Sequence, residues 1–434
     1  MARTLIGLFA GLILVCQIAV AQVEFFSDPV YYSLGTFPRS LATGDLDNDG
    51  DADLAAVCAE DDVLIILMCQ PDSSFVITEM EITGAYPNSI KTGHLNGDQA
   101  LDLVVANLSS RNVSIYYNNG FGSFANVVHH DIGIYPRAVV IADFNGENGN
   151  DLAVINLETD DVVIMLNDGT GSFTTGGTYV AGDQPMALVG ADFDGDLDSD
   201  LAVANYAVDS VCVLFNNGDA TFSSPVAYLV GDGPFALHAG SFNEDDAVDL
   251  AVVYYNAAAV AVLMNKGDGS LAKGVSYSVG SHPAMVCGGD FNADGLLDLV
   301  TANSVGDNVS LLQNLGGGLF AVADHYYAGD CPVSICVADF NRDNNVDLAA
   351  VNYWSSNLSV LYNISYANFL CGDVNHDTAV NLLDILYLIS YIYSGGPDPV
   401  PIKAGDVNND EASNLLDILH LIAFIYSDGP DPEC

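Results

Sequence analysis

The stretch GDLDNDGDADLAAV, residues 44–57, is the unit from which the fold can be predicted. Carboxylate side chains occupy alternating positions from Asp45 to Asp53, and an apolar run follows them directly. Six further copies, counted from the position of Asp45, begin at residues 94, 143, 192, 241, 290 and 339, so every step is 49 residues. A constant period of this length indicates supersecondary units that stack on one another.

Each repeat is predicted to form four short strands. In the third copy the strand-like segments cover residues 137–142, 151–155, 161–166 and 173–180, with turn residues between them. Four short strands per repeat are typical of propeller blades. We therefore predict a mainly β fold, a seven-bladed β-propeller with four strands per blade, over residues 22–365.

The two ends of the repeat array predict how the ring closes. Residues 26–35 have the register of an outermost strand, whereas the seventh repeat has only three clear strands and ends near Asn363. We expect the N-terminal strand to complete the last blade, which removes an open sheet edge. Phe369 falls in the same register and is the alternative, but the cysteine that follows it favours the N-terminal strand.

The charge balance excludes several classes of partner. The chain has 434 residues, of which 57 are Asp or Glu and 9 are Lys or Arg, for a net charge of −48. Binding to nucleic acid requires basic residues that replace the counterions of the phosphates, so a nucleic-acid partner is not expected. An anionic lipid surface is disfavoured for the same reason. With 50% hydrophobic residues, the chain is expected to be folded in spite of its charge.

The N-terminal segment predicts secretion. Arg3 precedes an apolar run over residues 5–21 that ends in Ala19-Val20-Ala21, the small-residue pattern of a signal peptidase site. We interpret residues 1–21 as a signal peptide; a membrane anchor is the alternative, but the run is short for a span. The mature chain is therefore expected to be extracellular, in part associated with the cell surface, with no membrane span and in an oxidising compartment.

The acidic loops are predicted calcium sites, because alternating oxygen ligands suit a hard cation that takes 6 to 8 of them. The second and fifth copies begin with His94 and Ser241, lose a carboxylate each and are expected to bind most weakly. Gly occupies the sixth loop position at Gly50 and Gly295, and elsewhere the residue there must accept a left-handed backbone. Plain Asx-rich turns, or a salt-adapted acidic surface, are the alternatives. The predicted ligands are Asp45, Asp47, Asp49, Asp51, Asp53, Asn96, Asp98, Asp102, Asp143, Asn145, Glu147, Asp151, Asp192, Asp194, Asp196, Asp198, Asp200, Asn243, Asp245, Asp249, Asp290, Asn292, Asp294, Asp298, Asp339, Asn341, Asp343 and Asp347.

The seven in-register copies vary around the motif D-x-[DN]-x-[DN]-G-x-x-D-L, each followed by a strand, and so the array resembles FG-GAP/VCBS repeats. These repeats occur in integrin-like and bacterial secreted seven-bladed propellers. The resemblance covers the predicted propeller and implies the same fold and a binding or adhesion role.

A different pattern begins at Cys371, after a short linker over residues 366–370. Two segments 33 residues apart each place calcium-type ligands ahead of an apolar helix that ends at glycine and proline. Positions 1, 3, 5, 9 and 12 of the two loops are Asp373, Asn375, Asp377, Asn381 and Asp384, and Asp406, Asn408, Asp410, Asn414 and Asp417.

This duplicated unit, residues 371–434, resembles a type I dockerin. The resemblance implies a small α-helical, EF-hand-like calcium module that docks on a cohesin domain, one repeat at a time. Thr378 and Glu411 depart from it, because they replace the turn glycine and weaken the expected calcium affinity. A self-contained cap is the alternative. Cys371 and Cys434 bracket the module and are predicted to form a disulfide.

A possible ligand face lies opposite the calcium loops. It is formed by the turns between the second and third strands and by the links before each repeat's proline. Exposed aromatic side chains there can stack on sugars or anchor protein partners. The predicted residues are Phe37, Tyr86, Tyr135, Tyr206, Tyr255, His282, Tyr353 and Trp354.

No catalytic group or organic cofactor is predicted from the residues. The leading hypothesis is a secreted, noncatalytic binding or adhesion subunit, anchored by its dockerin-like module to a cohesin-bearing assembly linked to polysaccharide binding or degradation. The alternative is a propeller-fold polysaccharide lyase or glycoside hydrolase that carries a dockerin.

Overall fold

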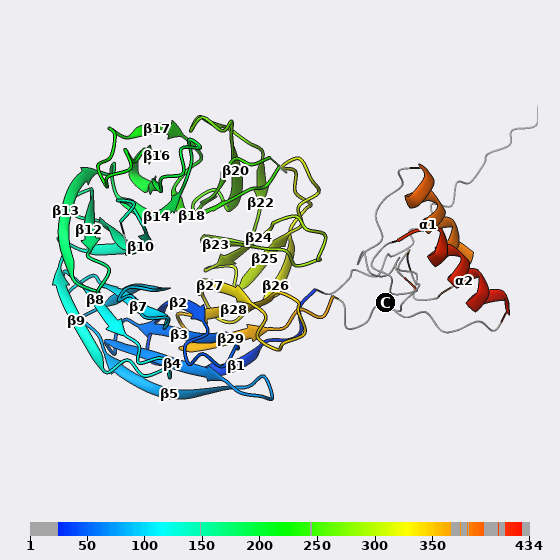
Figure 1. Cartoon of the computed structure of the whole chain (residues 1–434), viewed down its shortest axis with the longest axis horizontal. Coiled ribbons are helices and arrows are strands. Elements are labelled where there is room, and N and C mark those ends of the chain that lie inside the picture. Colours follow the sequence, from blue (N-terminus) through cyan, green and yellow to red (C-terminus); the bar gives the residue numbers. More distant parts are fainter. Residues whose placement is uncertain are drawn as a thin grey trace, which may run out of the picture.

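Seven β-sheets of similar size form a closed ring around a central axis in the computed structural model (Figure 1). The structure describes residues 25–147, 149–243, 245–365, 374, 380, 382–394, 407 and 413–427. Each blade has four strands in antiparallel order, with the first strand nearest the axis. In the fifth blade the outermost strand is split into two short pieces. The predicted seven-bladed propeller with four strands per blade is confirmed.

The strands follow the 49-residue period closely. Blade by blade, from the inside outward, they are β2 (Pro38–Gly44), β3 (Asp53–Cys58), β4 (Val63–Cys69) and β5 (Phe75–Ile82); β6 (Pro87–Gly93), β7 (Asp102–Asn107), β8 (Asn112–Tyr117) and β9 (Asn126–Asp131); β10 (Pro136–Ala142), β11 (Asp151–Asn156), β12 (Asp161–Asn167) and β13 (Phe173–Val180); β14 (Pro185–Ala191), β15 (Asp200–Asn205), β16 (Ser210–Leu214) and β17 (Val226–Leu229), with the 3-10 turn η1 (Tyr206–Val208); β18 (Pro234–Gly240), β19 (Asp249–Tyr254), β20 (Ala259–Asn265), β21 (Leu271–Ala272) and β22 (Ser276–Ser278); β23 (Pro283–Gly289), β24 (Asp298–Asn303), β25 (Asn308–Leu312) and β26 (Asp324–Tyr327); β27 (Pro332–Ala338), β28 (Asp347–Asn352) and β29 (Asn357–Leu361).

The hydrophobic core lies between neighbouring blades. The second strand of every blade is buried along its whole length, because blades cover both of its faces. The second residue of each acidic loop is a large apolar residue that is also fully buried. In six interfaces its carbonyl oxygen accepts a hydrogen bond from an asparagine of the next blade, as Leu46 does from Asn118 at 2.7 Å. Cys69 replaces this asparagine in blade 1, with its Sγ 3.6 Å from the carbonyl oxygen of Phe340.

The ring closes between its first and last segments, as predicted. Strand β1 (Val30–Ser33) pairs antiparallel with β29 and completes the seventh blade, so that blade joins both ends of the array. Beside it, the ring of Phe26 makes edge contacts with Phe291 and Tyr326 at centroid distances of 5.5 and 5.1 Å. The closure therefore consists of a strand pair and a buried aromatic anchor.

Two helices of 13 residues represent the C-terminal module in the described part of the chain: α1 (Leu382–Ser394) and α2 (Leu415–Ser427). They pack together through Ile385, Leu388, Ile418 and Leu421. Neither has the length needed to cross a membrane, and no other described helix does. The predicted signal peptide, the linker and the Cys371–Cys434 disulfide lie outside the described residues.

Candidate functional site

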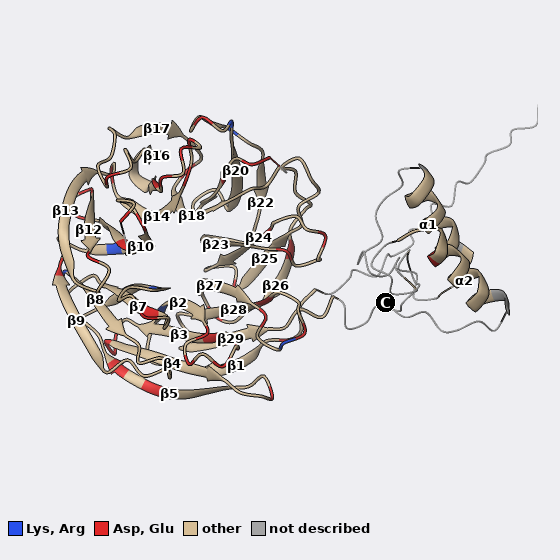
Figure 2. Ribbon diagram, viewed as in Figure 1, with Lys and Arg blue, Asp and Glu red and all other residues tan. Residues whose placement is uncertain are grey.

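The seven acidic loops connect the first and second strands of the blades, so they gather at one end of the ring. Figure 2 shows acidic residues in many of the loops around the ring, whereas most strand residues are neutral. The carboxylate oxygens of Asp45, Asp47 and Asp49 lie within 4.8 Å of one another, as do those of Asp192, Asp194 and Asp200. Oδ1 of Asp194 is buried and has no hydrogen-bond partner. A cluster of carboxylates with an unsatisfied oxygen fits a hard divalent cation.

The aspartate at the ninth loop position has a role that sequence reasoning missed. All seven are buried: Asp53, Asp102, Asp151, Asp200, Asp249, Asp298 and Asp347. One oxygen accepts the backbone N–H of the second loop residue at 2.9–3.1 Å, and the other accepts an N–H at the end of the third strand at 2.7–2.8 Å. These carboxylates therefore tie the blade together in addition to any role as ligands.

Burial makes the charge on these carboxylates costly. It raises the pKa of Asp298 and Asp347 to about 7. The two backbone N–H donors lower the pKa of each carboxyl group, and the neighbouring aspartates of the loop raise it. Burial raises the pKa of Asp53 to about 6 in the same way. A bound cation would offset this cost, because an adjacent positive charge favours the ionised form.

The two loops expected to be weak have neutral substitutes for the missing carboxylate. Nδ1 of His94 donates a hydrogen bond to the carbonyl oxygen of Ala100 at 2.9 Å, and Ala100 occupies the seventh loop position, which corresponds to Asp51 of the first loop. Oγ of Ser241 donates to the carbonyl oxygen of Asp245 at 2.8 Å. Both loops are thus closed by side-chain hydrogen bonds.

Backbone geometry separates the same two loops from others. The sixth position is left-handed in four loops, at Gly50, Leu197, Gly295 and Asn344, but not at Gln99 or Asp246. Leu197 adopts a φ of 77°, a left-handed conformation that is unfavourable for a residue with a Cβ. Its side chain is 90% exposed. The expectation that the non-glycine residue at this position is left-handed is confirmed for Leu197 and Asn344 and is wrong for Gln99 and Asp246. Asn148 of the third copy lies outside the described residues.

The remaining predicted ligands of the propeller lie in these same loops. Asn292, Asn341 and Asn243 donate their amide N–H to the carboxylate two residues later, at 2.9, 3.1 and 2.9 Å. The side chain of Asp51 forms an ion pair with Arg342 of the seventh loop, so only its carbonyl oxygen remains as a candidate ligand of the first loop.

Three of the predicted dockerin ligands lie in the described part of the chain. Asp384 and Asp417 are fully buried at equivalent positions near the start of α1 and α2. Oδ2 of Asp417 accepts the backbone N–H of Asn414 at 2.7 Å, and Oδ1 of Asn414 accepts that of Leu416 at 2.8 Å. The other predicted ligands of this module lie outside the described residues.

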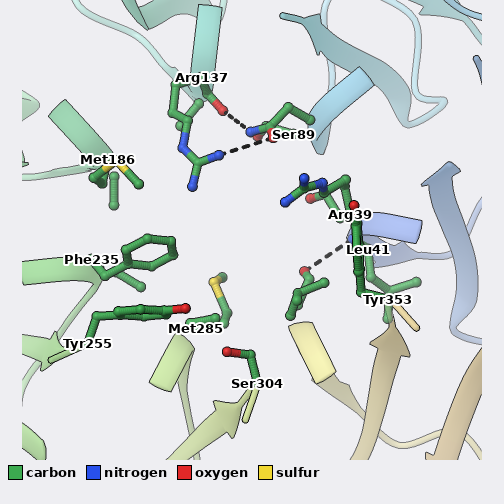
Figure 3. Close-up of a pocket in the computed structure, with 18 of the residues that line it drawn as sticks. Arg39, Leu41, Ser89, Arg137, Met186, Phe235, Tyr255, Met285, Ser304 and Tyr353 are labelled. Carbon is green, nitrogen blue, oxygen red and sulfur yellow. Dashed lines mark hydrogen bonds between the residues drawn. The ribbon is translucent and has the colours of Figure 1, made fainter. Parts of the chain in front are cut away.

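A cavity of about 500 Å³ lies at the axis, toward the opposite end of the ring. Of the predicted aromatic residues, Tyr255, Tyr353 and Trp354 line it. Figure 3 shows Tyr255 and Tyr353. Four others surround these lining groups: Phe37 stacks on Tyr353, His282 contacts Tyr255, Tyr206 contacts Phe235 and Tyr86 contacts Arg39. Tyr135 does not join them, and its ring lies 5.9 Å from the guanidinium carbon of Arg111.

The residue before each repeat's proline is left-handed in all seven blades: Phe37, Tyr86, Tyr135, Gln184, Gly233, His282 and Cys331. In several blades its N–H donates a hydrogen bond to an aspartate in the turn between the second and third strands of the preceding blade. At Tyr86, for example, the N–H donates to Oδ1 of Asp62 at 2.7 Å. This backbone fixes where the link side chains point.

The cavity also contains residues that sequence reasoning missed. Arg39, Arg137 and Phe235 each follow the proline that begins an innermost strand. This fixed place in the repeat, one residue after the proline, was the signal that could have identified them.

Comparisons with known proteins agree with both parts of the chain. A sequence profile of the FG-GAP-like repeat matches residues 94–154 and 290–350, and one of the dockerin type I domain matches residues 371–426. Dockerin type I domains bind calcium and are typical of extracellular proteins. No curated protein matches the chain.

Solved structures support the ring fold. A structure of BBS1N in complex with ARL6DN is 14% identical with a TM-score of 0.56, covering 78% of this chain and 97% of that one. Virginiamycin B lyase from Staphylococcus aureus is 11% identical with a TM-score of 0.54, covering 77% and 99%. A protein from Lactobacillus plantarum is 18% identical with a TM-score of 0.53, covering 69% and 88%. At these identities the similarity concerns the fold alone.

Proposed function

This chain joins FG-GAP-like repeats to a dockerin type I domain, and on that basis we propose that it is a secreted, noncatalytic binding subunit of a cohesin-bearing extracellular assembly. The dockerin domain anchors the protein, and the propeller presents a ligand site. A dockerin domain implies a cohesin partner, and polysaccharide is the proposed target of the assembly.

The observation that carries the anchoring role is a pair of matching exposed apolar stripes. Leu382, Leu386, Ile389 and Tyr393 are exposed on α1, and Leu415, Leu419 and Ile422 are exposed on α2. The spacing of three or four residues places each set on one helix face. The sequence predicts an apolar helix in each repeat, and only part of the apolar surface of each helix is buried in the helix pair. The exposed part is repeated on both helices and suits docking of a helix face on a partner.

The propeller loops are proposed to hold calcium as a structural ion. In the first copy the ligands would be Asp45, Asp47, Asp49 and Asp53, together with the Asp51 carbonyl. The ion would neutralise carboxylates that otherwise repel one another and would stabilise the loop. The clustered oxygens of the first and fourth loops, and the neutral hydrogen bonds that replace a carboxylate in the second and fifth, support this assignment and its ranking.

A noncatalytic role for the propeller is supported by the composition of its cavity. No Asp or Glu is among the described residues that line it. Glycoside hydrolases canonically use two carboxyl groups that flank the scissile bond. The walls instead offer aromatic and hydroxyl groups, which suit binding.

We expect cohesin binding to depend on the two stripes together. A Leu386→Asp, Leu419→Asp double variant should weaken binding to type I cohesin domains about thirtyfold or more, since it places a charge at the centre of each apolar face. Either single variant should bind nearly as well as the wild type, because the other stripe remains. Isothermal titration calorimetry against a panel of cohesins measures the effect.

A matched control is Val322→Asp, which changes a propeller residue that is 92% exposed. It should leave cohesin binding unchanged. Wild-type affinity in the double variant, with unaltered helix content by circular dichroism, would show that cohesins do not dock on these stripes.

A further inference from the structure

The central cavity concentrates positive charge in a strongly acidic protein. Arg39, Lys91 and Arg137 line it, out of only 9 basic residues in the chain, whereas no acidic residue of the described part of the chain does so. Arg39 and Arg137 occupy the same repeat position, one residue after the proline of β2 and β10. The remaining blades have uncharged residues at this position: Asn88, Met186, Phe235, Ala284 and Val333. The positive charge is therefore specific to blades 1 to 3.

The two guanidinium groups have hydrogen-bond donors to spare. Nη2 of Arg39 donates to the hydroxyl of Tyr86 at 2.7 Å, and Nη1 of Arg137 donates to Oδ1 of Asn88 at 3.1 Å. The Nε atoms of both arginines are buried and have no hydrogen-bond partner. Among the described residues, the ion pair that the structure records joins Arg342 to Asp51 and involves neither of them. Since arginine has five N–H donors, most of them remain for a ligand.

Holding these cations without a counter-ion is unfavourable. Burial and the nearby charge of Arg39 lower the pKa of Arg137 to about 10, so this side chain remains protonated at neutral pH. A partly buried charge with unsatisfied N–H groups costs free energy that an anion would recover. In Figure 3 the side chains of Arg39 and Arg137 both extend into the cavity.

Aromatic rings form the walls beside the arginines. Phe235 and Tyr255 stack at a centroid distance of 4.8 Å, and the guanidinium carbon of Arg137 lies 5.5 Å from the Phe235 ring. On the other wall the guanidinium carbon of Arg39 lies 4.6 Å from the Tyr353 ring, next to Trp354. Aromatic faces beside cationic forks offer stacking for a sugar ring and bidentate hydrogen bonds for an acidic group.

We propose that this cavity binds an acidic oligosaccharide, with its carboxylate or sulfate groups on Arg39 and Arg137 and its rings on Tyr255 and Trp354. The inference rests on the proposed binding function of the propeller and names its ligand class. The volume of about 500 Å³ lies within the range of about 300–1,000 Å³ typical of ligand pockets. Serine hydroxyls at Ser40, Ser89 and Ser304 also line the cavity and suit a hydroxylated ligand. A neutral oligosaccharide keeps the stacking but loses the charged contacts.

The test is calorimetric titration of the full-length protein with trigalacturonate, with its fully methyl-esterified form and with a sulfated galactan oligosaccharide. The methyl ester should bind about tenfold more weakly or worse than trigalacturonate, because hydrogen bonds to charged groups are the stronger ones. Binding of the carboxylated or of the sulfated oligosaccharide supports the proposal and distinguishes which acid is recognised. Equal binding of trigalacturonate and its methyl ester, or binding of no acidic oligosaccharide, overturns it.

Variants locate the binding site. Arg39→Gln and Arg137→Gln should each weaken binding of the acidic oligosaccharide about tenfold or more. Arg111→Gln is the matched control, because Arg111 also lies against an aromatic ring but does not line the cavity, and it should bind as the wild type does. Should a glutamine variant fold poorly, Arg137→Lys retains the charge without the planar fork and should bind with intermediate affinity. Equal losses in all three glutamine variants would overturn the assignment.

Two outcomes separate this inference from the proposed function. Failure to bind any acidic oligosaccharide, with cohesin binding intact, overturns the ligand class alone. Release of shorter products from a bound oligosaccharide keeps the ligand class and overturns the noncatalytic role.

Discussion

Chelation of calcium is expected to lower the melting temperature of the full-length protein by on the order of ten degrees. An ion that binds only the folded state adds RT ln(1 + [L]/Kd), about 2.7 kcal/mol for one site at a hundredfold excess over Kd. Several propeller loops would contribute together. Thermal melting with and without chelator, at matched ionic strength, measures the effect, and readdition of calcium should reverse it.

A pair of substitutions separates loss of the cation from loss of a turn. Asp49→Ala should cause a larger drop in melting temperature than Asp98→Ala. Both carboxylates accept a hydrogen bond of 3.0 Å from the backbone N–H two residues later, so both variants lose the same turn contact. Only Asp49 lies in a three-carboxylate cluster, whereas the Asp98 loop is closed by His94.

Two results would contradict the calcium assignment. One is a melting curve that does not respond to the chelator, and the other is an equal or larger loss from Asp98→Ala. Either would favour acidic turns that need no cation. A response to ionic strength alone would indicate the salt-adapted surface.

The second large effect concerns closure of the ring. Phe26→Ala should destabilise the propeller by about 3–5 kcal/mol, the usual cost of truncating a buried phenylalanine. Phe26 is fully buried against Phe291 and Tyr326, beside the pair of β1 and β29. Deleting residues 25–36 should have a still larger effect, because it exposes the edge of β29 and promotes association between molecules.

Tyr31→Ala is the control within the same segment. Tyr31 lies in β1 but is 45% exposed, so its loss should change stability by about 0.5 kcal/mol or less. Denaturant unfolding and size-exclusion chromatography measure both properties. A deletion variant that stays monomeric with wild-type stability would show that the closure strand is dispensable.

The repeat pattern was sufficient to predict the blades and their closure. The 49-residue period, the four strand-like segments of each repeat and the missing fourth strand of the last repeat are local features of the chain, and backbone pairing follows from them directly. His94 and Ser241, which stand where the other repeats have an aspartate, likewise identified two exceptional loops. The sequence could not show that the side chain of His94 contacts a carbonyl oxygen of its own loop, because that contact depends on the folded backbone.

The sequence by itself determined the seven-bladed ring, the acidic loops and the duplicated C-terminal helices, because each follows from periodic side chains along a short segment. Only the tertiary structure decided which residues meet across the axis. Arg39, Arg137, Tyr255 and Tyr353 come from different blades and converge on one cavity when the ring closes. It also decided which apolar residues of α1 and α2 remain exposed, because burial depends on how the helices pack together rather than on their common pattern.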